Sequence, residues 1–146
     1  MVTMTLKLLS TNVVKFWDLI KYALNQVERI GDVESLGVYN RLFAQLLSDK
    51  AQCFISYNES GDVQALCITE LRFDEVMDRK SLHLRCLYAF KPASNEEWAE
   101  KFQLIKEFAH NEGCKLITFE TANPRIKSIS KEIGAVEKSV NMVLEV

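Results

Sequence analysis

Residues 81–123 read SLHLRCLYAFKPASNEEWAEKFQLIKEFAHNEGCKLITFETAN, and this stretch decides the fold of the chain. Its first part alternates apolar residues with others, as β-strands do; the apolar residues are Leu82, Leu84, Cys86, Tyr88 and Phe90. Pro92 closes this strand, Ser94 begins a helix that Gly113 ends, and residues 115–120 form a second strand. Because a helix between two strands is a crossover connection, we expect the two strands to lie parallel, with a right-handed crossover.

Length and composition indicate one globular domain over residues 1–146, because a chain of this size buries roughly 70% of its unfolded surface. A content of 48% hydrophobic and 26% charged residues argues against a disordered chain. The formal net charge of -2 gives no electrostatic reason to bind nucleic acid, so we expect no nucleic-acid partner. No apolar run is long enough for a transmembrane helix and no signal peptide is recognisable, so we expect no membrane association and a cytoplasmic location as synthesised.

The cysteines are widely spaced, and most fall in or beside expected strands: Cys53, Cys67, Cys86 and Cys114. With only two histidines in the chain, this spacing does not indicate a metal centre, and we expect no metal. We expect buried, unreactive thiols in a reducing compartment.

The residues before the crossover predict a strand, two helices and a hairpin. Alternation over residues 4–8 predicts the first strand, and helical spacing predicts a helix that is capped within residues 10–12 and stopped by Gly31. A second helix is expected to open at Ser35. Two further strands are expected on either side of a polar hairpin loop, over residues 52–57 and 63–73.

After the crossover, Asn123 and Pro124 predict the start of a helix, because asparagine caps well and proline is favoured at the first helical position. Gly134 follows the last turn of this helix. The remaining residues alternate and predict one or two closing strands; the apolar positions are Val136, Val140, Met142, Leu144 and Val146. The expected order is therefore β-α-α-β-β-β-α-β-α-β, an α/β fold (α+β in some schemes) with a mixed, mostly antiparallel sheet flanked by helices.

This order resembles the GNAT superfamily of acetyl-CoA-dependent N-acyltransferases over nearly the whole chain. The hairpin loop ESGD, the helix end EGCK before the strand LITFE, and the segment NPRIKSISKEIGA are similar to the corresponding segments of that superfamily. The resemblance implies the GNAT fold and, in an active member, acetyl-CoA as cofactor and an amine as acceptor.

One departure concerns the loop that binds the CoA pyrophosphate. Typical members begin the central helix with a glycine-rich loop that carries an arginine or glutamine, and its backbone N–H groups and the helix dipole attract phosphate. Here the matching residues, 92–99, contain neither glycine nor arginine, and residues 94–97 read as a capping box. Glu96 and Glu97 would each oppose a pyrophosphate by about 3 kcal/mol at roughly 5 Å before screening, and Lys91 and Lys101 would offset part of this.

A second departure concerns proton transfer. Many members protonate the departing CoA thiolate with a tyrosine of the last helix, and the matching position here is Ser130, a weaker acid. His83 and Glu70, on adjacent expected strands, are the candidates for a general base, and Arg85 on the same face would lower the pKa of His83. An ordinary strand residue is the competing reading of His83, and we favour it. Cys86 is expected to be buried and inert.

Two functions therefore remain open. In the favoured one, the chain is a GNAT-fold protein that has lost acetyl-CoA chemistry, has no cofactor, and serves as a structural or protein-binding component, with a protein partner or a second copy of itself. Degenerate members of this kind occur among tailed-phage virion proteins, including internal core proteins, to which the segment KEIGAV is similar, so incorporation into a virion is part of this expectation.

The alternative is an active, divergent N-acyltransferase that acts on an amine. Acetyl-CoA would then contact the backbone of Leu87 and Ala89 in the opening between the parallel strands, together with Ser94, Asn95 and Asn123. Asn123 also has a sufficient structural role as a helix cap, which is the reading we favour for it.

Overall fold

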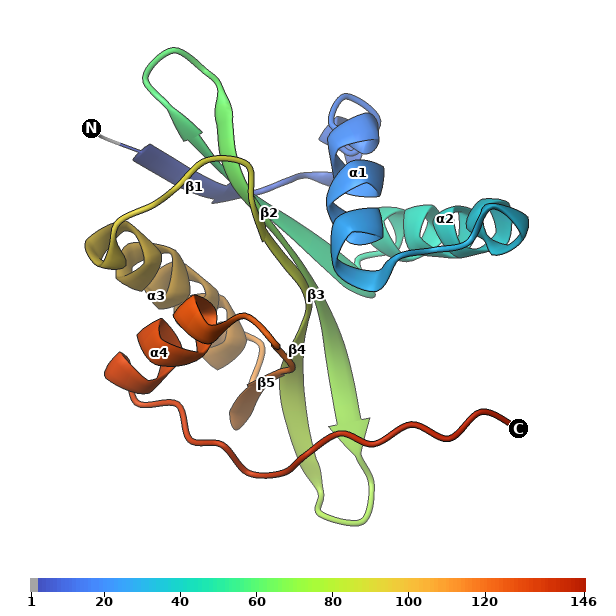
Figure 1. Cartoon of the computed structure of the whole chain (residues 1–146), viewed down its shortest axis with the longest axis vertical. Helices are drawn as coiled ribbons and strands as arrows, with labels where there is room; N and C mark the ends of the chain where they lie inside the picture. The colour runs from blue at the N-terminus through green and yellow to red at the C-terminus, as the bar shows by residue number, and fades with distance from the viewer. Residues whose placement is uncertain (1–2) are drawn as a thin grey trace.

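The computed structural model describes residues 3–146, and its five-stranded sheet has helices on both faces (Figure 1). The elements are β1 (Thr3–Lys7), a 3₁₀ turn (Ser10–Asn12), α1 (Trp17–Glu28), α2 (Asp32–Leu47), β2 (Ala51–Asn58), β3 (Val63–Asp74), β4 (Arg79–Ala89), α3 (Asn95–Asn111), β5 (Leu116–Phe119) and α4 (Pro124–Glu132). Among the described residues, no helix is both long and apolar enough to span a bilayer.

The sheet confirms the predicted crossover. Its strand order is β1-β2-β3-β4-β5, in which neighbours are antiparallel except β4 and β5, which are parallel and joined by α3. The mixed, mostly antiparallel sheet flanked by helices was therefore predicted correctly.

Two cores lie on opposite faces of the sheet. One packs under α1 and α2, and its buried residues include Ile20, Leu24, Leu46, Ile55, Leu66 and Ile68. The other packs under α3 and α4, and its buried residues include Phe54, Leu82, Leu84, Trp98, Ile105 and Ile129. Each helix pair thus covers its own face, as Figure 1 shows with α1 and α2 on one side and α3 and α4 on the other.

A β-bulge in β4 corrects the expectation that its alternating apolar residues share one face. Thr69 pairs with Leu84 and Ile68 pairs with Cys86, so that Arg85 has no partner in β3. An extra residue shifts the alternation by one position. Leu84 accordingly packs under α3, whereas Cys86 and the residues beyond it, Tyr88 and Phe90, pack with the α1–α2 core.

The first two helices begin and end at different residues from those expected. Residues 10–12 form a 3₁₀ turn, and α1 begins only at Trp17. It ends before Gly31 because Arg29 adopts a left-handed conformation (φ 51°) and the Asn25 side chain accepts a hydrogen bond from the Ile30 backbone N–H at 2.9 Å. Gly31 instead precedes the first residue of α2, which begins at Asp32 rather than at Ser35.

The predicted helix caps at the other end of the chain are confirmed. The Ser94 hydroxyl accepts a hydrogen bond from the Glu97 backbone N–H at 3.2 Å, and Asn123 Oδ1 accepts one from the Arg125 backbone N–H at 2.9 Å. Gly134 follows α4 with φ 99°, a conformation that favours glycine.

The predicted closing strands are wrong in this structure. Residues 135–146 contain no strand, and their apolar side chains are exposed. Alternation predicts how a strand would distribute its side chains, but a strand also needs a neighbour with which its backbone can bond, and none lies beside this segment.

Candidate functional site

The parallel strands separate partway along β4. Pairing runs from Ser81 with Leu116 to Leu84 with Phe119, where β5 ends, while β4 continues to Ala89. Within the described residues, the last part of β4 therefore pairs with β3 alone. Leu87 and Ala89, the expected pantetheine contacts, are half-buried beside this opening and pack on the α3 side.

One backbone N–H at the N-terminus of α3 is capped by the chain's own side chain, and α4 contacts the same end of the helix. The Ser94 hydroxyl accepts a hydrogen bond from the Glu97 backbone N–H. In a full capping box the Glu97 carboxylate would accept a bond from the Ser94 backbone N–H, but here it lies 3.3 Å from the Ser94 hydroxyl instead. The Arg125 guanidinium donates a hydrogen bond to the Ala93 carbonyl, and Asn95 Nδ2 donates one to Glu132 at 3.5 Å. α4 is thus bonded to the entrance of α3.

The fold brings three of the expected cofactor contacts close to one another. Ser94 and Asn95 lie at the start of α3, and Asn123 caps α4, whose Arg125 reaches the residue before Ser94. Asn123 is occupied as a helix cap, which confirms the structural reading of this residue.

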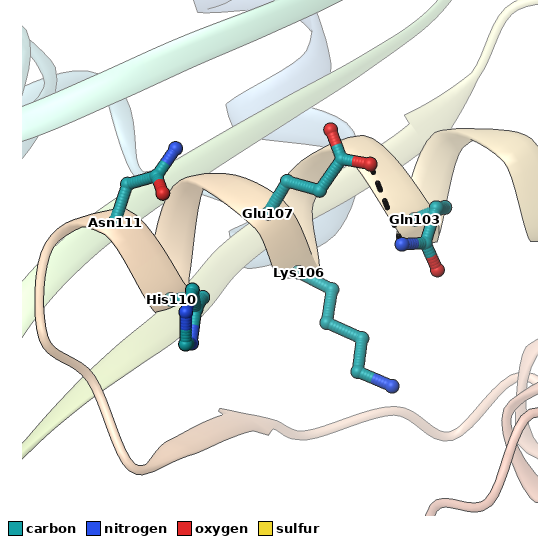
Figure 2. A pocket seen from close by; sticks show the side chains of 5 residues that line it. All are labelled: Gln103, Lys106, Glu107, His110 and Asn111. Atoms are coloured by element: carbon teal, nitrogen blue, oxygen red, sulfur yellow. Dashed lines mark hydrogen bonds between the residues drawn. The ribbon is translucent and has the colours of Figure 1, made fainter.

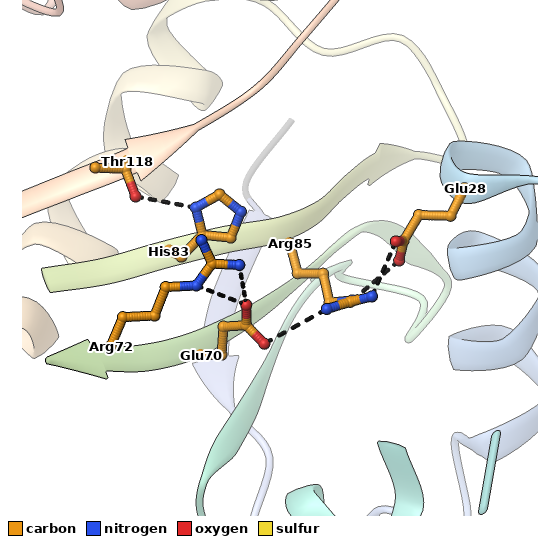
Figure 3. A network of polar contacts seen from close by, with 6 residues as sticks. All are labelled: Glu28, Glu70, Arg72, His83, Arg85 and Thr118. Carbon is orange, nitrogen blue, oxygen red and sulfur yellow. Dashed lines mark hydrogen bonds and ion pairs between the residues drawn. The ribbon is translucent and has the colours of Figure 1, made fainter. Parts of the chain in front are cut away.

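A second group of polar side chains lies on the opposite face of the sheet, which α1 and α2 partly cover. Figure 3 shows its members, which we call the β3–β4 polar cluster: Glu28, Glu70, Arg72, His83, Arg85 and Thr118. Glu70 and His83 pair directly across β3 and β4, and Thr118 lies opposite His83 on β5. The two candidate bases are therefore adjacent, as predicted.

Arginine side chains surround Glu70. Arg72 Nε donates to Glu70 Oε1 at 2.9 Å, and Arg85 Nη1 lies 3.6 Å from Glu70 Oε2. Arg85 also binds Glu28 of α1 with two nitrogens, each at 3.0 Å. Glu70 thus lies between two guanidinium groups, and Arg85 links it to Glu28 of α1.

His83 is the second candidate base, and it contacts the parallel strand β5. Its Nδ1 lies 2.9 Å from Thr118 Oγ1, a hydrogen bond whose direction depends on the imidazole tautomer. Burial lowers the pKa of His83, and Arg72 and Arg85 lower it further, while Glu70 and Glu120 raise it in part. The predicted effect of Arg85 therefore has the right sign, but burial is the larger cause. The imidazole is neutral at pH 7 and retains a nitrogen that can accept a proton.

Ser130 lies apart from these groups. Its side chain is buried in α4, where the hydroxyl donates a hydrogen bond to the Ile126 carbonyl at 2.6 Å. A hydroxyl that is engaged within its own helix is not placed to protonate a leaving group.

The cysteines have the predicted character. Cys53, Cys67 and Cys86 are buried free thiols, and Cys114 is half-buried. Burial raises the pKa of the Cys86 thiol to about 12, with a smaller contribution from Glu28, so the reactive thiolate is scarce at neutral pH. Residues 3–146 contain no grouping of three or more histidine, cysteine or acidic side chains suited to a metal ion.

Two surface hollows of the described residues lie away from these groups. One, of about 490 Å³, is lined by polar residues of the exposed side of α3: Gln103, Lys106, Glu107, His110 and Asn111 (Figure 2). A second, of about 410 Å³, is lined by Asn25, Gln26, Arg29 and Ile30. Each is bordered mainly by one helix and includes none of the predicted site residues, so neither is the candidate site.

Solved structures with the same architecture are acetyltransferases. Glucosamine-6-phosphate N-acetyltransferase from Arabidopsis thaliana is 15% identical, with a TM-score of 0.71 over 99% of each chain. A predicted acetyltransferase from Clostridium acetobutylicum, solved with acetyl-CoA, is 12% identical, with a TM-score of 0.72 over 99% of this chain and 96% of that one. The ribosomal-protein-alanine N-acetyltransferase of Brucella melitensis is 10% identical, with a TM-score of 0.70 over 99% of this chain and 100% of that one.

The chain has the GNAT fold. The predicted resemblance is thereby confirmed at the level of fold, and identities of 10–15% carry no more than that. No family model and no curated protein matches the sequence.

Sequence reasoning missed three members of the polar cluster of this GNAT-fold chain. Arg72 lies two residues after Glu70, so strand alternation alone could have placed it on the same face. Thr118 and Glu28 carry no such signal, because their positions depend on the register of β5 and on how α1 crosses β4.

Proposed function

We propose that this GNAT-fold chain does not use acetyl-CoA and that it acts by binding another protein. The observation that carries the proposal is the capped, acidic N-terminus of α3, the place where members of the similar superfamily bind the CoA pyrophosphate.

Hydrogen bonds and charge at this terminus both support the proposal. Ser94 already occupies the Glu97 backbone N–H, and Glu96 and Glu97 place two carboxylates in the first turn. Arg125, the cation at this end of α3, donates to the Ala93 carbonyl. A pyrophosphate would have to displace these contacts and overcome two like charges.

The lysines expected to offset this repulsion have different surroundings. Lys91 Nζ lies 4.0 Å from the Asp62 carboxylate. Lys101 is 5% exposed, and its Nζ lies 5.3 Å from the centre of the Trp98 ring. Burial lowers the pKa of Lys101, although Glu97 and Glu100 oppose this shift. Lys101 is therefore withdrawn from solvent, whereas Lys91 is exposed and only loosely paired.

A protein partner is supported by exposed apolar side chains. At the tip of the β3–β4 hairpin, Phe73 is 60% exposed, Val76 93% and Met77 57%. Clustered apolar side chains on a surface commonly mark a contact with another protein. The similarity of KEIGAV, residues 131–136, to internal core proteins of phage virions extends the proposal to a virion component.

The second candidate is an N-acyltransferase that acts on an amine. The stretch of β4 beyond its pairing with β5 and the lowered pKa of His83 support it, because an acyltransferase of this fold would hold the pantetheine arm beside that stretch and needs a base near the middle of β4. Glu70, the other candidate for the base, is paired with Arg72 and Arg85.

Thermal unfolding with and without millimolar acetyl-CoA tests the proposal. A ligand present at 100 times its dissociation constant adds about 2.7 kcal/mol, which raises the melting temperature of a domain of this size by several degrees. We expect no shift for this chain, and a several-degree shift for an acetyl-CoA-binding GNAT enzyme measured beside it.

The double variant Glu96→Gln/Glu97→Gln is the matched control. If charge repulsion contributes to the exclusion, acetyl-CoA should shift the melting temperature of this variant more than that of the wild type. A shift of several degrees for the wild type, or acetylation of an amine in a panel assay, would contradict the proposal and favour the acyltransferase.

A further inference from the structure

Two buried side chains within the described residues carry polar atoms that lack a hydrogen-bond partner: Ser56 Oγ and Lys101 Nζ. Ser56 is 1% exposed and Lys101 is 5% exposed. A buried hydroxyl, and above all a buried amine, costs free energy when it is left unpaired, so most such groups in folded proteins bond to protein, water or an ion. These two atoms therefore call for a partner from outside the chain.

Both atoms lie in the layer between α3 and β2. The ring centroids of Phe54 on β2 and Phe108 on α3 are 5.4 Å apart, which marks where the two elements meet. Ser56 follows Phe54 by two residues, so it also faces α3, about 7 Å farther along the strand. Lys101 precedes Phe108 by seven residues, so it lies on the same side of α3, about 10 Å nearer the start of the helix.

The directions of the two elements bring these residues to the same end of the layer. β2 runs parallel to β4, because each is antiparallel to β3, and α3 runs back along the sheet from the end of β4 to the start of β5. A step toward the start of α3 is therefore also a step toward the end of β2. Ser56 and Lys101 thus face each other one level beyond the contact between Phe54 and Phe108, across a gap that the long lysine side chain can span.

Lys101 lies in apolar surroundings, and the acidic residues that affect its pKa do not bond to it. Its Nζ lies 5.3 Å from the centre of the ring of Trp98, a member of the core under α3. Burial lowers the pKa of Lys101 and is the larger effect, while Glu97 and Glu100 raise it. Glu100 is exposed, and the Glu97 carboxylate lies 3.3 Å from the Ser94 hydroxyl. The ammonium group is therefore left without a bonded counter-charge.

We propose that Lys101 Nζ and Ser56 Oγ bind a small monovalent anion, of the size of chloride, between α3 and β2. An ammonium group and a hydroxyl both donate hydrogen bonds, so a ligand that they share must accept them. One negative charge compensates the buried ammonium, whereas a water molecule would leave its charge unpaired. Because both side chains are almost fully enclosed, the ligand is small. Such a site would exist whether or not the chain uses acetyl-CoA.

Thermal unfolding at constant ionic strength tests the site, with sodium chloride replaced stepwise by sodium gluconate, whose anion is much larger. At a chloride concentration about 100 times the dissociation constant, the wild type should melt several degrees higher than in gluconate. Lys101→Met keeps an unbranched apolar stem without the charge, and its melting temperature should not depend on chloride. Lys106→Met, the same change on the exposed side of α3, is the matched control and should respond to chloride as the wild type does.

Ser56→Ala keeps the buried charge and removes one donor, so we expect it to bind chloride at least about tenfold more weakly, and it tests the site even if Lys101→Met does not fold. In crystals grown with bromide, anomalous scattering should locate an ion between Lys101 and Ser56. A water molecule at this place, or a wild-type melting temperature that chloride does not change, would overturn the proposal. An equal chloride response in the wild type and in Lys101→Met or Ser56→Ala would overturn it as well.

Discussion

His83 shows how one residue acquires its character from several elements. It lies on β4, contacts Thr118 of β5 at 2.9 Å, and faces Glu70 and Arg72 of β3. Burial and the neighbouring arginines lower its pKa, so the folded protein binds a proton less readily than the unfolded chain does. Acid therefore favours the unfolded chain at this residue.

The stability of the protein should fall as the pH drops below about 6.5, the ordinary histidine pKa, because the unfolded state then takes up a proton that folded His83 resists. This contribution is lost progressively until the pH reaches the lowered folded pKa. Urea unfolding between pH 5 and 7.5 measures it, and His83→Gln should flatten the slope in this window. If the free energy of unfolding changed equally with pH in the wild type and the variant, the pKa of His83 would not be lowered by folding.

At the scale of elements, the entrance of α3 has a structural role that competes with phosphate binding. The Ser94 hydroxyl caps the helix, and the following turn is acidic, which suits the positive end of a helix dipole. These features stabilise the helix on their own and leave little attraction for an external anion.

Ser94→Ala should lower the free energy of unfolding by about 1 kcal/mol, because it leaves the Glu97 N–H without its partner. Ser94→Asp, which can also cap the helix, is the matched control and should stay near the wild-type value. Urea denaturation measures both. If Ser94→Ala matched the wild type, the cap would contribute nothing and the helix terminus would be available to other ligands.

At the scale of the whole molecule, Arg85 connects the sheet to helix α1. The bulge in β4 leaves Arg85 outside the regular pairing, and its guanidinium reaches Glu28 at the end of α1 with two contacts at 3.0 Å. The ion pair links α1 to β4 and is partly exposed, so its contribution is modest.

Arg85→Ala should destabilise the protein by about 1 kcal/mol, the upper end for a partly exposed pair with two parallel contacts. Arg85→Lys keeps the charge without the planar fork, and we expect it to recover only part of the loss. Urea unfolding in low and high salt measures both variants, and the loss should shrink in high salt. A loss for Arg85→Ala that salt does not reduce would point to packing of the arginine stem instead.

The sequence by itself determined which segments form helices and strands between residues 51 and 134, because apolar period, caps and turn residues act over short distances. It also determined the parallel pair β4–β5, since a helical crossover requires it. The helix caps at Ser94 and Asn123 were predictable for the same reason, because each bond joins residues only two or three positions apart.

Only the tertiary structure decided the features that depend on contacts distant in sequence. The bulge at Arg85 depends on the register between β3 and β4, and the polar cluster depends on bringing α1 and β5 to the same place. The alternation of residues 136–146 was sufficient to predict a strand but not to supply its neighbour. Strand pairing needs two segments, and the alternation of one segment does not show whether a second strand lies beside it.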